Sequence, residues 1–225
     1  MQNKNNNLPK YITFDAYGTL VDFQLNSATR KIIGERANRI DIEAFLDDFH
    51  DLRWEEILKE YRPYETVLRR CLAIVMRKYG LDYTVEDGDA IIAAVPTWGP
   101  FPDVPPVLRK LRQYCKIVII SNSEDRLMEK NIENIGVPFD DYITAEQARA
   151  YKPSPAVFEY TLKKLGCNKS EILHVANGFE YDIMPAHDLG WSAVWINREG
   201  IQGDPAYGPY EELPDLNGLP DLLGI

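Results

Sequence analysis

Short apolar runs recur along the chain with longer amphipathic stretches between them, and this alternation limits the fold more than any other feature. The clearest run is KIVII at 116–120, which lacks the polar alternation of a strand with one face in solvent. Strands that alternate with helices predict an α/β fold built on a parallel sheet. Beyond Gly200 the chain is rich in Gly and Pro, and we expect irregular structure up to a short Leu-rich turn. The predicted strands are 11–14, 116–120, 141–144, 172–175 and 193–196.

The region from about residue 25 to 95 differs from the rest because its patterns are helical throughout. Stretches 42–61 and 65–79 are amphipathic, and Gly80 follows the second one as a helix C-cap would. The segment PTWGPFPDVPP at 96–106 contains five prolines, which indicates a hinge or boundary. We therefore expect a helical insertion after the first strand, followed by a return to the sheet.

Composition excludes several classes of function. The formal net charge of −10 opposes nucleic acid and anionic membrane as partners. No stretch approaches the roughly 20 apolar residues of a membrane span, and the N-terminus lacks the apolar core of a signal peptide, so we expect a cytoplasmic protein. The cysteines Cys71, Cys115 and Cys167 are odd in number and widely spaced, which favours buried thiols over a disulfide framework or a zinc site.

Polar residues gather where the predicted strands end. In an open parallel sheet, ligands bind outside the carboxyl ends of the strands. A single aspartate at such a point is usually a turn or helix-capping residue, but four polar clusters at one edge indicate a site. The residues that follow the strands, or the helical stretch EQARA, are Asp15, Ala16, Tyr17, Gly18 and Thr19, then Ser121, Asn122 and Ser123, then Lys152, and finally Asn177, Glu180 and Asp182.

These motifs, D-x-x-G-T, S-N, K-P and a last one that ends in Asp, resemble in type and order the haloacid dehalogenase (HAD) superfamily. The resemblance covers nearly the whole chain. It implies a Rossmann-like parallel-sheet core, residues 1–21 and 98–225, with an inserted α-helical cap domain at 22–97. It also implies that Asp15 is a nucleophile that forms a covalent ester.

Two positions argue against the phosphatase reaction of most members. Phosphatases carry a second aspartate where this chain has Tyr17, and a phenol with a pKa of about 10 is a poor acid–base catalyst near neutral pH. They hold Mg²⁺ with an aspartate where this chain has Asn177, and Mg²⁺ prefers carboxylates among its few protein ligands. We therefore expect neither a metal nor another cofactor.

The form D-x-Y-G-T-L instead resembles the L-2-haloacid dehalogenases, which need no leaving-group acid because halide departs as a stable anion. The resemblance implies that Asp15 attacks C2 of a small (S)-2-haloalkanoic acid and expels halide. Water then hydrolyses the ester to release the 2-hydroxy acid. Lys152 is placed by its motif to favour the ionised form of Asp15. A homodimer is a further family expectation.

The same resemblance assigns the binding groups. The hydroxyls of Thr19 and Ser121 can donate hydrogen bonds to the carboxylates of the nucleophile or the substrate. Backbone N–H groups of Ala16 and Tyr17 can hold the substrate carboxylate, while the Tyr17 ring packs against its apolar part. Asn122, in the S-N motif, is the expected halide contact.

The cap of such a dehalogenase supplies an arginine that assists departure of the halide. In FHDLRWEEILKEY, Arg53 lies beside Trp54, as in the dehalogenases, although their order is Trp-Arg. Arg62, Arg69 and Arg70 are rivals for this role. The alternative interpretation of Arg53 is a surface residue on an acidic helix.

The fourth motif, N-G-F-E-Y-D, departs from the dehalogenase form because Asp182 lies five residues after Asn177 rather than three. We expect Asp182, with Asn177, to orient and activate the hydrolytic water. Glu180 is a second candidate, more simply interpreted as a solvated loop carboxylate. A related branch opens azetidine-2-carboxylate through the same ester and needs a proton donor. His174 and His187 flank the loop and are candidates for this donor, but a packed core residue is the simpler interpretation of His174 and an outward-facing residue that of His187. Ring opening therefore remains a minor alternative. A HAD phosphatase is the other alternative. The complete motif set disfavours a non-catalytic binding module.

Overall fold

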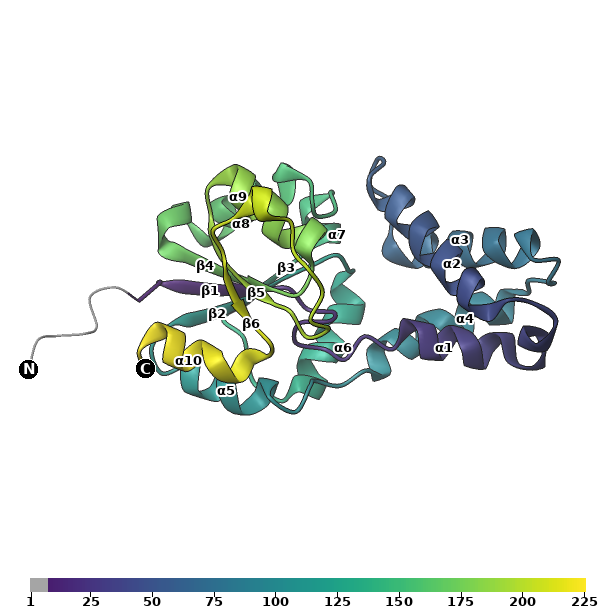
Figure 1. Ribbon diagram of the computed structural model, residues 1–225, viewed down its shortest axis with the longest axis horizontal. Helices are drawn as coiled ribbons and strands as arrows, with labels where there is room; N and C mark the ends of the chain where they lie inside the picture. The colour runs from purple at the N-terminus through teal and green to yellow at the C-terminus, as the bar shows by residue number, and fades with distance from the viewer. Residues whose placement is uncertain (1–7) are drawn as a thin grey trace, which may run out of the picture.

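The computed structural model describes residues 8–225, and segment 1–7, at the expected start of the core, lies outside them. A six-stranded parallel sheet forms the centre, in the order β3-β2-β1-β4-β5-β6 (Figure 1). In the register, Tyr11 of β1 pairs with Lys116 of β2 and with Ile172 of β4. The strands are β1 (Tyr11–Phe14), β2 (Lys116–Ser121), β3 (Asp141–Thr144), β4 (Ile172–Ala176), β5 (Ser192–Ile196) and β6 (Glu211–Leu213).

The five predicted strands are confirmed, and three of them are one residue longer than predicted. The sixth, β6, lies in the region expected to be irregular, and its Glu211 pairs with Val194 of β5. An edge strand that carries two exposed glutamates has no apolar run to reveal it, and its charges discourage pairing with another chain.

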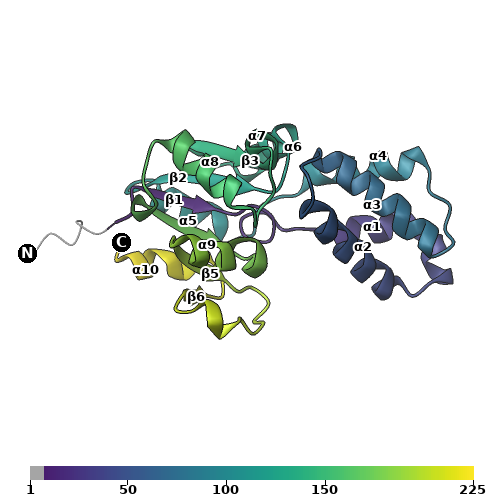
Figure 2. The same ribbon diagram turned by 90° about the horizontal axis from the view of Figure 1, so that it is seen from above.

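Helices cover both faces of the sheet, which explains why its strands are apolar throughout (Figures 1 and 2). Ile12 and Phe14 of β1 belong to the hydrophobic cluster that includes α5, α6 and α10, whereas Tyr11 belongs to the one with α8 and α9. The three cysteines are free thiols, two of them buried. Within residues 8–225, no helix is long and apolar enough to span a membrane. The helices of the core are α5 (Val104–Leu111), α6 (Asp125–Ile135), α7 (Ala145–Ala148), α8 (Pro155–Leu165), α9 (Met184–Leu189) and α10 (Leu219–Leu223).

Four helices form a cap beside the carboxyl edge of the sheet (Figure 1). Asp41 caps α2 by accepting hydrogen bonds from two backbone N–H groups, and Thr84 and Asp87 form a capping box at the start of α4. Gly80 follows α3 with a φ of 68°, which fits its predicted role at a helix end. We keep 22–97 as the proposed bounds of this cap. Its helices are α1 (Leu25–Ile33), α2 (Ile42–Ile57), α3 (Tyr64–Lys78) and α4 (Val85–Ala94).

Two adjacent segments join the cap to the core. The Asp22 N–H donates to the Gly99 carbonyl at 2.9 Å, and the Phe101 N–H donates to the Leu20 carbonyl at 3.1 Å. The predicted hinge at 96–106 is therefore shorter than expected, because its last residues begin α5. Prolines fit the first turn of a helix, where the missing N–H has no partner to lose.

Candidate active site

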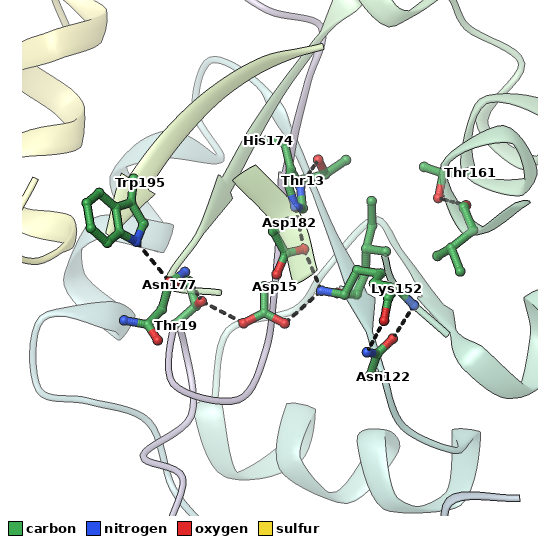
Figure 3. A network of polar contacts seen from close by, with 12 residues as sticks. Thr13, Asp15, Thr19, Asn122, Lys152, Thr161, His174, Asn177, Asp182 and Trp195 are labelled. Atoms are coloured by element: carbon green, nitrogen blue, oxygen red, sulfur yellow. Dashed lines mark hydrogen bonds and ion pairs between the residues drawn. The ribbon is translucent and has the colours of Figure 1, made fainter. Parts of the chain in front are cut away.

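The polar residues at the strand ends meet in one pocket between the sheet edge and the cap. The pocket has a volume of about 560 Å³. The core supplies Asp15, Lys152 and Asp182 to its wall, and the cap supplies Arg53 and Trp54. Figure 3 shows that the core residues form one continuous network of hydrogen bonds and ion pairs.

Asp15 lies at the end of β1 with only 8% of its surface exposed. Its Oδ1 accepts from Lys152 Nζ at 2.8 Å, and its Oδ2 accepts from Thr19 Oγ1 at 2.7 Å. Thr19 Oγ1 also accepts the Asn177 N–H at 2.8 Å and so links the first and fourth motifs. In the turn between Asp15 and Thr19, Gly18 has a φ of 86°, and a Cβ at this position would come within 3.1 Å of the Asn177 side chain. The turn therefore requires glycine.

Lys152 is buried, with 1% of its surface exposed, and its ammonium has three acceptors. Nζ donates to Asp15 Oδ1 at 2.8 Å, to Asp182 Oδ1 at 2.7 Å and to the Ile120 carbonyl at 2.9 Å. Burial works to lower the pKa of Lys152, but the two carboxylates outweigh it and raise this pKa above its ordinary value. The lysine is thus held as a cation between two acids.

The pKa values of the two carboxyl groups shift in opposite directions. Burial raises the pKa of Asp15, and the opposing effect of Lys152 is too small to cancel it, in part because Asp182 is a nearby like charge. Burial also acts to raise the pKa of Asp182, but Lys152 and a hydrogen bond from His174 outweigh it and hold this pKa below its ordinary value. Asp182 is therefore the more firmly ionised of the two.

The fourth-motif loop reaches Asp182 through one wide turn. Residues Phe179–Ile183 form a π-helical turn, and the Asp182 N–H donates to the Gly178 carbonyl at 3.0 Å. Such turns contain an extra residue and often occur at functional sites, which accounts for one of the two additional residues between Asn177 and Asp182. Glu180 is exposed, in agreement with its interpretation as a solvated carboxylate.

Asn177 is tied to the wall of the core. Its Nδ2 donates to the Ile196 carbonyl at 2.9 Å, and its own carbonyl accepts from Trp195 Nε1 at 2.9 Å. The side chain still lines the pocket beside Gly178. Asn177 is thus held by β5, and no hydrogen bond to Asp182 forms in the described part of the chain.

The S-N motif differs most from the expectation. Ser121 Oγ is buried and has no hydrogen-bond partner among residues 8–225, so of the two carboxylates that it was expected to bind, that of Asp15 does not accept from it. Asn122 accepts the Lys152 N–H at 2.7 Å and donates to the Lys152 carbonyl at 2.9 Å. This amide fixes the backbone of the lysine, and one of its N–H hydrogens is already used although the residue lines the pocket.

Comparison with known protein families agrees with this architecture. The family model that describes haloacid dehalogenase-like hydrolases matches residues 9–190. The chain belongs to the haloacid dehalogenase-like hydrolases. It is 29% identical to an (S)-2-haloacid dehalogenase of Pseudomonas sp. strain YL, over 95% of this chain and 94% of that protein.

Solved structures share the fold of this hydrolase. The L-2-haloacid dehalogenase of Xanthobacter autotrophicus with chloropropionic acid covalently bound has a TM-score of 0.79 at 23% identity, and the match covers 96% of this chain and 99% of that one. The HAD-hydrolase YfnB of Bacillus subtilis, bound to magnesium, has a TM-score of 0.83 at 17% identity, over 97% and 100% of the two chains.

Tyr17, two residues after Asp15, has its hydroxyl engaged in contacts with the core. Its hydroxyl donates to Asn131 Oδ1 at 3.0 Å and lies 3.1 Å from Ser123 Oγ, while its ring packs against Phe23 and Trp98. Burial raises the pKa of this phenol far above its ordinary value.

Backbone donors lie on the same loop. Within residues 8–225, neither the Ala16 nor the Tyr17 N–H has a hydrogen-bond acceptor. The Tyr17 side chain faces the pocket, whereas Ala16 is fully buried. The loop therefore retains two N–H groups without an acceptor in the protein, and of the two residues only Tyr17 lines the pocket.

Only one of the four candidate arginines lines the pocket. Arg53 Nε donates to the Phe49 carbonyl at 3.2 Å, and its guanidinium lies 4.9 Å from the centroid of the Phe49 ring. Next to it, the Trp54 ring packs edge-on against Tyr181 of the core at 4.6 Å. Arg53 is therefore the one candidate cap arginine that lines the same pocket as Asp15.

The other arginines pair with acids elsewhere on the cap. Arg62 and Arg70 both bind Glu56, at 3.2 and 3.5 Å, and Arg69 binds Asp89 at 2.7 Å. None of the three is a pocket residue. Their positions do not bring them to the nucleophile.

Two basic residues that the sequence did not single out, Arg198 and His50, also line the pocket. Arg198 Nη2 donates to the Thr19 carbonyl at 2.8 Å and pairs with Asp103 at 2.9 Å, so it braces the loop that follows Asp15. His50 lies one helical turn before Arg53 on α2. Spacing by three residues could have revealed His50, whereas Arg198 is too far along the chain from Thr19 for any sequence pattern.

The two histidines near the fourth motif have different environments. His174 is fully buried, as expected, but it also contacts the site through Asp182. His187 is exposed on α9 and lies 3.2 Å from Asp188. Neither lines the pocket.

Proposed function

We propose that the protein hydrolyses the carbon–halogen bond of (S)-2-haloalkanoic acids to give 2-hydroxy acids, without a metal, through an ester on Asp15. The observation that carries this proposal is the Lys152 ammonium bound to both Asp15 and Asp182. The Lys152 ammonium already lies between the two carboxylates. The phenol of Tyr17 and the amide of Asn177 occupy the two positions where a phosphatase needs carboxylic acids. The relation to a haloacid dehalogenase at 29% identity supports the same reaction class.

In the first step, a carboxylate oxygen of Asp15 forms a bond to C2 of the substrate while the carbon–halogen bond breaks. Thr19 and Lys152 each donate a hydrogen bond to one oxygen of this carboxylate and so fix its orientation. The free N–H groups of Ala16 and Tyr17 receive the substrate carboxylate, and Arg53 stabilises the departing halide from the cap side. Halide leaves as an anion, so no general acid is needed.

In the second step, water attacks the carbonyl carbon of the Asp15 ester, and Asp182 accepts the proton. The low pKa of Asp182 keeps it ionised for this task. Because a neutral ester then replaces the Asp15 carboxylate, Lys152 remains paired with Asp182 alone. Asn177 positions the loop that carries Asp182 rather than acting on the water.

Two other reactions fit the geometry less well. Lys152 already donates to one oxygen of Asp15 and one of Asp182, and the described residues contain no group of three or more His, Cys, Asp or Glu side chains placed to hold a metal ion. We therefore derive no step through a metal. Opening of a strained amine ring needs a proton donor at the leaving group, and the two histidines proposed from the sequence, His174 and His187, lie off the pocket.

The pocket also sets the range of substrates. Its volume of 560 Å³ is within the roughly 300–1,000 Å³ of small-molecule sites, and is larger than a two- or three-carbon acid requires. Phe23, Trp54 and Phe101 give it apolar walls. We expect 2-haloacids with longer alkyl chains to be accepted alongside the short ones.

Halide release is the direct test. The protein is incubated with 2-chloropropionate, 2-bromohexanoate and bromoacetate in the presence of EDTA, and separately with p-nitrophenyl phosphate and Mg²⁺. We expect halide release from the S enantiomers that EDTA does not reduce, and none from the Asp15→Asn variant. Mg²⁺-dependent phosphate release without any halide would refute the proposal in favour of a phosphatase.

A further inference from the structure

The buried residue His174 is hydrogen-bonded to Asp182, the proposed acceptor of the water proton. His174 lies on β4 with no exposed surface, and its Nε2 is 2.8 Å from Asp182 Oδ1. On the other side of the ring, Nδ1 is 2.9 Å from Thr13 Oγ1 of β1. Figure 3 shows the chain from Thr13 through His174, Asp182 and Lys152 to Asp15. His174 and Thr13 are both outside the pocket, so neither can touch the substrate.

The partners of the ring determine which nitrogen carries the hydrogen. An ionised Asp182 can only accept, so the Nε2 atom of His174 must be the donor. In the neutral ring, Nδ1 then accepts the hydroxyl hydrogen of Thr13. The rings of Phe158 and Trp191 pack edge-on against the imidazole, at 6.0 and 6.3 Å, and hold its plane. The ionised aspartate thus selects the tautomer, and the threonine hydroxyl supplies the hydrogen-bond partner of the other ring nitrogen.

This arrangement treats the two oxygens of Asp182 differently. Oδ1 accepts from both Lys152 and His174, at 2.7 and 2.8 Å. Oδ2 is buried and has no donor among residues 8–225. It faces Gly178, where a Cβ would come within 2.8 Å of Oδ2. Of the four carboxylate oxygens of Asp15 and Asp182, Oδ2 alone keeps its lone pairs free of protein donors.

We infer that His174 is a positioning residue for the second half of the reaction, which holds Asp182 by Oδ1 so that Oδ2 accepts the proton of the hydrolytic water. The inference rests on the proposed function. The water oxygen bonds to the carbonyl carbon of the Asp15 ester, and one water proton goes to Oδ2. The bond from that carbon to the substrate oxygen then breaks, and the alkoxide takes the proton from Oδ2. A neutral hydroxyl is formed, and Asp15 is left as a carboxylic acid with the second water proton. Release of that proton to solvent restores the carboxylate.

The role predicts separate effects on the two half-reactions. His174→Phe keeps an aromatic ring in the core but removes the donor to Asp182. Formation of the ester should continue near the wild-type rate. Its hydrolysis should slow by roughly 10- to 100-fold, a part of the roughly 10²- to 10⁴-fold that a general base supplies. In a rapid-quench experiment with 2-chloropropionate, this appears as a burst of about one chloride per site, and the ester is detected by mass spectrometry on the peptide that contains Asp15.

Milder variants separate positioning from a structural effect. Thr13→Val keeps the shape of the threonine but leaves the buried Nδ1 of His174 without its hydrogen-bond partner, and it should also lengthen the lifetime of the ester. Thr161→Val is the matched control, because Thr161 is equally buried but donates to a helix carbonyl in α8. It should leave the lifetime unchanged. His174→Gln offers an amide N–H near the Nε2 position and should recover part of the hydrolysis rate.

The outcomes are distinct. If wild-type protein forms the ester and His174→Phe and Thr13→Val hydrolyse it at the wild-type rate, the inference is overturned while the proposed function stands. Equal slowing of both half-reactions in Thr13→Val would also overturn it, because a loosened structure affects both steps. If wild-type protein releases no halide from any 2-haloacid, the proposed function itself fails.

Discussion

Replacement of Lys152 by methionine gives the largest predicted change in stability at this site. The methionine side chain fills similar volume but carries no charge, so Asp15 and Asp182 are left buried and facing each other. Loss of one member of a buried ion pair costs about 3–5 kcal/mol, because the remaining charge has no partner. Here two carboxylates lose contacts of 2.8 and 2.7 Å, so we expect the upper part of this range.

Lys164 provides a matched control for this substitution. Its Nζ also has three acceptors, Asp141 Oδ1, the Tyr142 carbonyl and Gln147 Oε1, at 2.8 to 3.0 Å. The difference is solvent exposure, 29% for the Lys164 side chain against 1% for Lys152. Exposed pairs contribute about 0–1 kcal/mol. Lys164→Met should therefore have little effect.

Urea unfolding measured by circular dichroism compares the free energies of unfolding. We expect Lys152→Met to lower the midpoint strongly and Lys164→Met to leave it close to wild type, with similar slopes. Adding Asp182→Asn to Lys152→Met should recover part of the loss, since it removes one of the two unpaired charges. Equal midpoints for the two lysine variants, or a further loss in the double variant, would refute the assignment of Lys152 as a buried cation that both acids require.

Three further results are expected. Arg53→Leu should lower kcat/KM for 2-chloropropionate by about 10²-fold, as removal of a charge-stabilising donor does. The control Arg62→Leu should leave kcat/KM near wild type. Equal effects of the two substitutions would contradict the choice of Arg53. Because burial raises the pKa of Asp15 and the nucleophile must be ionised, kcat/KM should decline on the acid side at a pH above the ordinary range of aspartate; a decline only at ordinary aspartate pH would contradict this. Asp87→Asn should cost about 1 kcal/mol without loss of activity, since Arg36 binds Asp87 at 2.6 Å far from the pocket. The hydrogen bond from Arg36 lowers the pKa of Asp87, so this stabilisation is present above the ordinary pKa and is lost as the pH falls through the lowered one; a thermal-melt difference that persists under strong acid would contradict it.

The parts that sequence could predict are those with a local pattern. The buried strands were visible because both faces of the sheet are covered, and the order of the motifs was enough to bring Asp15, Lys152 and Asp182 to one edge. The edge strand β6 was missed because its two glutamates face solvent. Its residues follow no apolar pattern, so only pairing with β5 reveals it.

The remaining differences depend on contacts between distant segments. The sequence motif could not show that the Asn122 side chain binds the backbone of Lys152, thirty residues away. It also could not show that Arg198 binds the Thr19 carbonyl. The choice of Arg53 over Arg62 required the orientation of the cap helices against the core. His174 was interpreted as a packing residue because a histidine inside a strand usually is one, and only the geometry links it to Asp182.

The central claim is that Asp15, rather than water, displaces the halide. Single-turnover reaction with excess enzyme in H₂¹⁸O tests it directly, because water then attacks the Asp15 carbonyl and the product takes its hydroxyl oxygen from the aspartate. The account predicts ¹⁸O in the peptide that contains Asp15 and an unlabelled 2-hydroxy acid. Label found directly in the product, with none in that peptide, would contradict it.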